Sequence, residues 1–415
     1  MATTQSDSDA ANKYWLKPWL ILLFALVAWN AVWLTALSVA TKQNEFTDDV
    51  PAIYEEFLAD PSINLSDRHR KVYGASVAAP GLPLEIAAAD AMLTPRVGAF
   101  LMYRLTFAAC IIVGTMLGFA VAFRRIAIPI SKRDWLCTFW IAIVPVGWVG
   151  STIMAQDDSF STLWSGVALL AYSSLGPVAA TVASGFGIFF GKPLMVINLL
   201  GIWIASAGRR WLVTAVGGAI VLAFAAFLFW RDGTNQTSYN VPSFMGPNPF
   251  GILHLLGVEI DPKTTRSLSA ILILLSTGIF TLFALRQKLS FVAASCGLYS
   301  LFLAFYLGAM PEYEMWYLPL VIVALWGAVQ QQQWLLFWTG WLHSFFANAY
   351  KVLYGFNQNF ETAGKSGLKN WYAQNIGWDL QWLQILMAVA TVGCAIAFAV
   401  LLLRRDPTKS VTPRP

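Results

Sequence analysis

Residues 98–125 read GAFLMYRLTFAACIIVGTMLGFAVAFRR. The run from 98 to 122 carries one charged side chain, Arg104, and the pair Arg124/Arg125 follows it. About 20 apolar residues in a helix span the hydrocarbon core of a bilayer, and basic residues favour its cytoplasmic end. The stretch therefore predicts a transmembrane helix that ends in the cytoplasm.

The whole chain has the composition of a polytopic membrane protein. Of its 415 residues, 57% are hydrophobic and 12% are charged, which is about half the charged share of a soluble domain. The net charge of +5 is gathered in clusters between apolar runs, so it indicates topology rather than nucleic-acid binding. The cysteines form neither a disulfide framework nor a metal-ligand spacing. All four lie in apolar runs: Cys110, Cys137, Cys296 and Cys394.

Five basic clusters are expected in the cytoplasm. They are Lys13/Lys17, Arg124/Arg125 with Lys132/Arg133, Arg209/Arg210, Arg286/Lys288, and Arg404/Arg405 with Lys409. They predict an all-α membrane domain over 18–405 with about twelve transmembrane helices, between cytoplasmic tails at 1–17 and 406–415. The expected helices cover 18–40, 98–122, 135–154, 160–175, 178–190, 194–208, 211–230, 268–285, 289–309, 316–331, 334–350 and 382–403. The expected external loops are 41–97, 231–266 and 351–380.

The stretch 177–208 is expected to form a pair of short helices. It begins and ends in the cytoplasm because Arg209/Arg210 close it, and its length of about 32 residues lies between one full span and two. We expect the two helices to meet at Gly191-Lys192-Pro193, each rising roughly 20 Å. Lys192 would then lie recessed in the outer leaflet, where a lysine needs an anion or a carboxylate as its partner.

The first external loop is expected to contain short amphipathic helices. Apolar residues fall on one side of 50–59 and of 82–93, with the spacing of a helix. Helices of this kind lie on a membrane surface. The loop is therefore expected to follow the membrane rather than to extend into water.

Charged and polar groups gather on the non-cytoplasmic side in this topology. Charge near the membrane interior is costly and indicates function. Most of these groups also have a plain structural explanation: a solvated surface for the acidic pair of the first loop, helix caps for the other carboxylates, snorkelling for the arginine, and an ordinary interfacial position for the histidine. Such an explanation is weakest for the lysine. The groups are Asp48, Asp49, Arg104, Gln156, Asp157, Asp158, Lys192, His254, Glu312 and Glu314.

Several short motifs follow one another between about residues 18 and 335. They are Phe46-Thr47-Asp48-Asp49, Tyr54-Glu55, Ala155-Gln156-Asp157-Asp158, Gly185-Phe186-Gly187-Ile188, Gly191-Lys192-Pro193-Leu194 and Glu312-x-x-x-Trp316-Tyr317-Leu318-Pro319. Their order resembles the GT-C superfamily of integral membrane glycosyltransferases, in particular its polyprenyl-phosphate-sugar-dependent, mannosyltransferase-like branch. The doubled aspartate and its spacing to Tyr54 depart from the family pattern, so the choice of base between Asp48 and Asp49 stays open.

The resemblance implies transfer of mannose, or another hexose or pentose, from a polyprenyl-phosphate donor to a lipid- or envelope-linked glycan. The reaction would invert the anomeric carbon at the non-cytoplasmic face of the plasma or inner membrane, with Asp49 or Asp48 as general base. No cofactor is implied, and a divalent cation held by carboxylates is an alternative to direct hydrogen bonding. Lys192, Arg104 and Arg96 would bind the donor phosphate. Sugar and acceptor would be bound by Tyr54, Gln156, Asp157, Asp158, His254, Glu312 and Glu314.

Two other classes of protein fit the same sequence. A secondary transporter or flippase of a lipid-linked or small polar substrate would use intramembrane charges and often shows inverted repeats, whereas the charges here gather at one face. An O-antigen polymerase or ligase would place paired Arg and His in a large external loop. The run Arg68-His69-Arg70-Lys71 fits that pattern, and it equally fits a patch that touches anionic headgroups.

Overall fold

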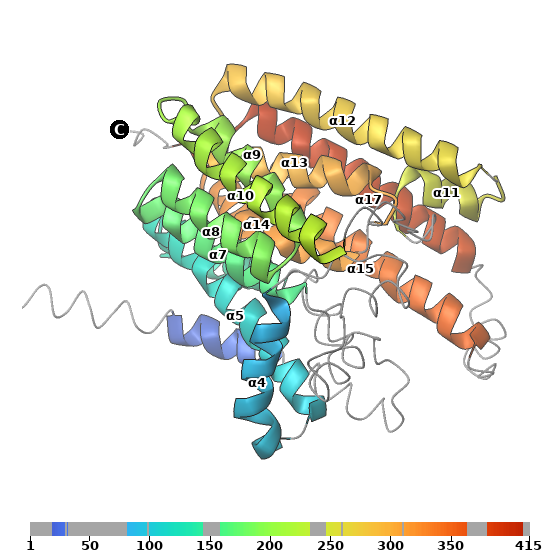
Figure 1. Cartoon of the computed structure of the whole chain (residues 1–415), viewed down its shortest axis with the longest axis horizontal. Coiled ribbons are helices and arrows are strands. Elements are labelled where there is room, and N and C mark those ends of the chain that lie inside the picture. Colours follow the sequence, from blue (N-terminus) through green and yellow to red (C-terminus); the bar gives the residue numbers. More distant parts are fainter. Residues whose placement is uncertain are drawn as a thin grey trace, which may run out of the picture.

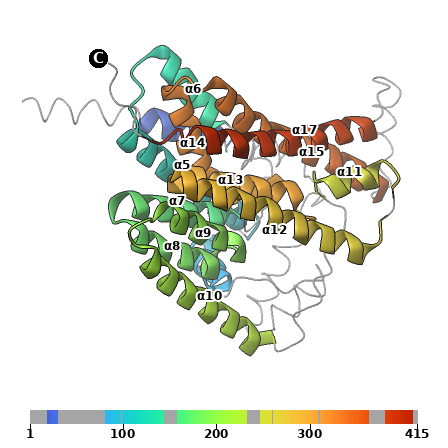
Figure 2. The same cartoon turned by 90° about the horizontal axis from the view of Figure 1, so that it is seen from above.

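Helices form every regular element in the part of the chain that the computed structural model describes. That part comprises residues 19–29, 31, 81–97, 99–143, 158–232, 246–258, 260–308, 311–362 and 380–409. The long helices lie side by side in one bundle, and α4 lies at its edge, across the direction of α12 and α17 (Figures 1 and 2). The all-α fold class predicted from the sequence is confirmed.

The helices follow the expected order closely. The first half of the chain forms Trp19–Trp29, α4 (Leu82–Val97), α5 (Ala99–Arg125), α6 (Lys132–Ala142), α7 (Ser159–Ser174), α8 (Pro177–Phe190), η2 (Pro193–Met195), α9 (Val196–Ala205) and α10 (Arg210–Asp232). The second half forms α11 (Pro249–Leu255), α12 (Pro262–Gln287), α13 (Phe291–Phe305), η4 (Pro311–Tyr317), α14 (Leu318–Gln330), α15 (Trp334–Thr362) and α17 (Leu380–Arg404).

Two helices are longer than the sequence pattern predicted. α12 begins at Pro262 rather than near 268, because the Asp261 carboxylate accepts the Thr264 N–H at 2.9 Å and proline is favoured in the first turn. α15 continues to Thr362 rather than ending near 350, because no proline interrupts it and Gly364 is the next glycine after Gly355. Parts of the loops expected at 231–266 and 351–380 are therefore helical.

Contacts between helix termini define one end of the bundle, which we call the basic end. Arg125 Nε donates to Ser173 Oγ at 2.9 Å, and Lys409 Nζ donates to the Gln287 carbonyl at 2.8 Å. The Arg133 guanidinium lies 5.0 Å from the centre of the Trp334 ring. Four basic clusters lie in the described residues of this end: Arg124/Arg125 with Lys132/Arg133, Arg209/Arg210, Arg286/Lys288, and Arg404/Arg405 with Lys409.

Helices α7, α8 and α9 run back and forth between the basic end and the opposite end. The turn from α7 to α8 uses Gly176, whose φ of 95° suits glycine, followed by Pro177 in the first turn of α8. At the far end, a Cβ added to Gly191 would lie 2.8 Å from the Gly187 carbonyl oxygen and 3.0 Å from Ser161 Oγ. Glycine therefore lets the tip of the short helix pair pack closely against α7.

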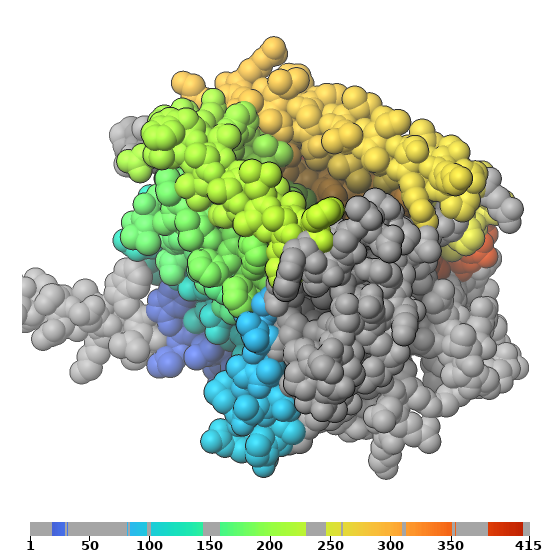
Figure 3. Space-filling view, in the orientation of Figure 1, coloured from blue at the N-terminus to red at the C-terminus, as the bar shows by residue number. Residues whose placement is uncertain are grey.

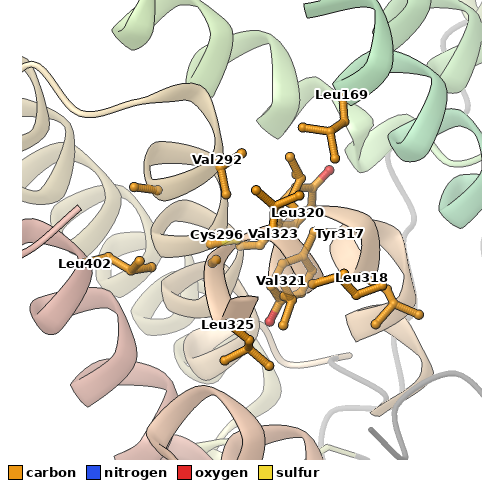
Figure 4. Close-up of a cluster of buried hydrophobic side chains, with 14 of the residues drawn as sticks. Leu169, Val292, Cys296, Tyr317, Leu318, Leu320, Val321, Val323, Leu325 and Leu402 are labelled. Carbon is orange, nitrogen blue, oxygen red and sulfur yellow. The ribbon is translucent and has the colours of Figure 1, made fainter. Parts of the chain in front are cut away.

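The core of the bundle surrounds α14. Every residue from Leu318 to Val329 is buried, which is typical of a helix that is apolar on all sides and packed in the interior. Side chains from several helices meet there (Figure 4): Leu169 of α7, Val292 and Cys296 of α13, Leu320 and Val323 of α14, and Leu402 of α17. This packing fixes η4, which leads directly into α14, at the end of the bundle opposite the basic end.

Four helices in the described residues are long and apolar enough to cross a membrane: Leu101–Arg125, Arg210–Phe229, Pro262–Gln287 and Gln381–Arg404. α12 lies along the outside of the bundle (Figure 3) and exposes Leu274 and Leu282 to 71% and 62%. Extended apolar surface of this kind suits lipid better than water. These features are consistent with a membrane protein, and the count of twelve crossings stays a prediction.

Candidate functional site

A buried carboxylate, Asp158, joins three segments at the end of the bundle opposite the basic end. Its Oδ1 accepts a hydrogen bond from Trp316 Nε1 at 2.6 Å and lies 3.6 Å from Lys192 Nζ. The Asp158 side chain is 1% exposed, and that of Lys192 is 20% exposed. We call these three residues the Asp158 cluster and this end of the molecule the site end.

The position of Asp158 does not reduce to helix capping. The residue occupies the N-cap of α7, yet its side chain makes no capping hydrogen bond and its backbone is already helical, with φ −58° and ψ −22°. The carboxylate faces Trp316 and Lys192 instead. The helix-cap role suggested by the sequence therefore does not explain the orientation of this side chain.

Lys192 reaches Asp158 because α8 stops short of the residue. The helix ends at Phe190, and Lys192 adopts an extended backbone, with φ −125° and ψ 143°, before η2 begins at Pro193. Its side chain is only partly buried, and an ammonium group can donate three hydrogen bonds. A lysine oriented by a buried carboxylate can thus also bind an anion that approaches from outside the bundle.

Trp316 is itself held by two further contacts of η4. Its ring stacks on Tyr313, with centroids 4.3 Å apart, and Thr162 Oγ1 of α7 donates to the carbonyl oxygen of Met315 at 2.9 Å. These contacts join η4 to the first turn of α7. The hydrogen bond between Trp316 and Asp158 is therefore one of several contacts that hold η4 against α7.

A second buried pair lies on the other side of η4. Glu314 Oε1 lies 3.0 Å from His343 Nε2 of α15, and the two side chains are 3% and 4% exposed. The His343 Nδ1 atom lies 3.2 Å from the Thr391 carbonyl oxygen of α17. Burial raises the pKa of Glu314 from 4.5 to about 8, against the opposing effect of a hydrogen bond with Ser344. Glu314 is therefore mainly protonated at neutral pH.

Arg104 lies buried on α5 near the level of the Asp158 cluster. The Phe107 ring packs edge-on against Phe160 of α7, with centroids 5.8 Å apart, and α5 and α7 run parallel because Arg125 meets Ser173 at their far ends. Arg104 is three residues, or about 4.5 Å of helix rise, closer to the site end than Phe107. The structure thus places a second cation at this end of the bundle.

The other described candidates lie on the surface. Arg96 is exposed at the end of α4, and its Nη1 donates to the Met92 carbonyl of the same helix at 3.0 Å. His254 is exposed on α11, a helix that packs against α17. The structure therefore does not bury either residue with Asp158.

The remaining candidates lie outside the described residues: Asp48, Asp49, Tyr54, Gln156, Asp157 and the side chain of Glu312. The choice of base between Asp48 and Asp49 stays a prediction. So do the sugar-binding roles of the other four. The amphipathic helix expected at 50–59 lies in the same part of the chain.

The helix expected at 82–93 is present as α4, and it docks beside the short helix pair. It buries Ile86 but exposes Leu84 and Met92, so its apolar residues do not share one buried face. The Gly81 N–H donates to the Phe189 carbonyl at 2.7 Å. Burial raises the pKa of Glu85 to about 7, and a hydrogen bond from Trp164 of α7 opposes this rise. α4 thus contacts α7 and α8 next to the turn that carries Lys192.

Two residues of this site were missed by sequence reasoning. Trp316 is part of a motif that carried the family resemblance, but the motif assigned it no partner. His343 lies within the apolar run 334–350, and an ionisable residue in such a run indicates function by default. That signal was present in the sequence, whereas its partner Glu314 could not be read from it.

Comparison of the chain with protein-family models, with curated proteins and with solved structures found no match. Within the ranges that the structure describes, no three His, Cys, Asp or Glu side chains form a group that could hold a metal ion.

Proposed function

We propose that the protein is an integral membrane glycosyltransferase that moves a sugar from a polyprenyl-phosphate donor to a lipid- or envelope-linked glycan on the non-cytoplasmic side. One observation carries the proposal: a partly exposed lysine, Lys192, is oriented by the buried carboxylate of Asp158 at the end opposite the basic clusters. A lipid phosphate presents an anion at the membrane surface, and a fixed cation there suits it.

In the proposed reaction, the basic residues stabilise the leaving phosphate and an aspartate accepts the proton of the acceptor. An acceptor hydroxyl attacks the anomeric carbon while the bond from that carbon to the phosphate oxygen breaks, and polyprenyl phosphate leaves. Lys192, together with Arg104, stabilises the charge on the leaving phosphate. Asp49 or Asp48 accepts the hydroxyl proton. A single displacement of this kind inverts the anomeric carbon.

The test is a transfer assay with purified protein in lipid nanodiscs. The donors are radiolabelled polyprenyl-phosphate mannose, glucose and arabinose, and the acceptors are glycolipids extracted from the membrane. We expect wild-type transfer from one donor, a loss of about 100-fold in Lys192→Ala, and loss of transfer with retained donor binding in Asp49→Asn or Asp48→Asn. Lys263→Ala, at an exposed position of α12, is the matched control. Transfer from none of the donors would contradict the proposal.

A second candidate, a proton-linked transporter or flippase, is favoured by the Glu314–His343 pair. Two ionisable side chains buried together in a helix bundle can take up and release a proton, as a proton-linked transporter requires. Proteoliposomes that contain a pH-sensitive dye distinguish the two candidates. A transporter produces substrate-dependent proton flux that His343→Gln abolishes, whereas a glycosyltransferase produces none and consumes the donor.

A further inference from the structure

We infer that Glu314 and His343 are positioning residues, which fix η4 so that Trp316 holds Asp158 against Lys192. The inference deepens the proposed function and rests on it for the role of the site, because it assigns the pair to the same donor-binding cluster. The geometry itself is independent of any substrate. Two side chains of η4, Glu314 and Trp316, contact different neighbouring helices.

η4 is attached to the bundle on two sides. Trp316 donates to Asp158 at the start of α7, and Glu314 meets His343 in α15. In a 3₁₀ helix with three residues per turn, positions two residues apart point in directions about 120° apart. The segment therefore bridges α7 and α15, so a change at the Glu314 contact alters how the same segment presents Trp316 to Asp158.

The hydrogen-bond partners require that Glu314 and His343 share one proton. The Thr391 carbonyl can only accept, so His343 Nδ1, 3.2 Å away, has to donate to it. The Nε2 atom and Glu314 Oε1 lie 3.0 Å apart, close enough for the two groups to share a single proton. If that proton is lost, two acceptors face each other in a buried site, which is unfavourable.

Among the residues that the structure describes, few other ionisable groups surround this pair. Tyr317 of the same segment interacts electrostatically with Glu314. Tyr317 also interacts with Cys296 and Tyr299 of α13. Ser344 of α15 hydrogen-bonds with Glu314, and α14 carries no ionisable side chain. Asp158 of α7 lies beyond Trp316. Glu85 of α4 also titrates near pH 7 beside the turn that carries Lys192, so the effect of the shared proton is the part of the pH dependence that Glu314→Gln removes.

The rate at which Lys192 is acetylated reports whether Lys192 is held against Asp158, and it requires no assay of function. Full-length protein is treated with a water-soluble N-hydroxysuccinimide acetate, and acetylation of Lys192 is quantified by mass spectrometry against exposed Lys263. We expect Glu314→Ala and His343→Phe to raise the Lys192/Lys263 ratio several-fold. Glu314→Gln keeps a donor toward His343 Nε2, so it should retain the wild-type ratio. Folded Glu314→Ala protein with the wild-type ratio would overturn the inference.

An infrared measurement tests the shared proton even where a disruptive variant fails to fold. Wild-type protein at neutral pH should show the carbonyl band of a protonated carboxylic acid that Glu314→Gln lacks. Absence of that difference contradicts the placement of the shared proton on Glu314 at neutral pH. The ratio of Lys192 to Lys263 acetylation in wild type should also rise as the pH passes about 8, and it should stay constant in Glu314→Gln.

Binding of polyprenyl phosphate separates this inference from the proposed function. We expect Glu314→Ala to weaken binding at least tenfold and Glu314→Gln to leave it unchanged. If wild type does not bind polyprenyl phosphate while Lys192 reactivity follows the pair, the proposed function fails and the positioning role stands. If wild type binds and Glu314→Ala binds equally well, the positioning role fails alone.

Discussion

Asp158, Trp316 and Glu314 connect parts of the chain that lie far apart in sequence. Trp316 and Asp158 are 158 residues apart, yet their side chains are joined by a hydrogen bond of 2.6 Å. Glu314 meets His343 across the same segment. Lys192, the residue proposed to bind the donor, is thus held by a short chain of contacts that ends in α15 and α17.

Replacing Trp316 with phenylalanine should damage both stability and donor binding. The change removes the hydrogen bond to a carboxylate that is 1% exposed, and loss of a partner for a buried polar group costs about 1–3 kcal/mol. Unfolding in detergent micelles measures the stability, and binding of polyprenyl phosphate measures the site. Trp326→Phe is the matched control, because its Nε1 donates to Ala127 at 2.8 Å near the basic end. Equal loss of binding in both variants would contradict the assigned role.

Glu314 should make the stability of the protein fall as the pH rises. Its pKa is about 8 in the folded protein and ordinarily 4.5, so the folded state binds the proton more tightly. The stabilising effect of that proton is complete below about pH 4.5 and is lost as the pH rises through about 8. The melting temperature of wild type should therefore fall more than that of Glu314→Gln between pH 5 and 9. Parallel curves would show that Glu314 is not the titrating group.

Sequence reasoning at the residue scale identified positions but not partners. It selected Asp157 and Asp158 together, because the choice of which aspartate faces the interior depends on where α7 begins. It predicted that a recessed Lys192 needs an anionic partner, and the structure supplies Asp158. It could not pair Glu314 with His343, since local periodicity carries no information about contacts between distant segments.

The tip of the short helix pair should tolerate almost no added volume. A Cβ in Gly191→Ala would meet the Gly187 carbonyl oxygen at 2.8 Å and Ser161 Oγ at 3.0 Å, and overpacking of this kind costs about 1–3 kcal/mol. We expect lower stability in thermal unfolding and weaker donor binding, since Lys192 is the next residue. Gly218→Ala on α10, where nothing lies within 4 Å, should instead keep or raise stability by about 0.5–1 kcal/mol. Unchanged behaviour of Gly191→Ala would contradict the close packing.

The element scale was the most predictable. The basic pair Arg209/Arg210 required a short helix pair before it, and α8 and α9 are such a pair. The start of α12 was missed because apolar periodicity begins several residues after its Asp261 cap. The end of α15 was missed because the polar composition of its last turns suggested a loop, although no proline ends the helix.

At the scale of the whole molecule, the charge pattern says more about the direction of each helix than hydropathy does. α13 and α14 are apolar and span 15 and 13 residues, and a run of that length fits a buried core helix as well as a short crossing. Hydropathy therefore cannot count crossings here. In contrast, the four basic clusters among the described residues lie at one end of the bundle, as their alternation along the chain predicts, and Lys13/Lys17 lies outside the described residues.

The central claim is that the Asp158 cluster and the basic clusters face opposite sides of a membrane. Single cysteines at Val258, exposed near the site end, and at Ile130, exposed at the basic end, test it most directly in a Cys394→Ala background, where the remaining cysteines are buried. A membrane-impermeant maleimide should label Val258→Cys in intact cells and Ile130→Cys only after permeabilisation. Labelling of both positions from the same side, or in the reverse order, would contradict the account.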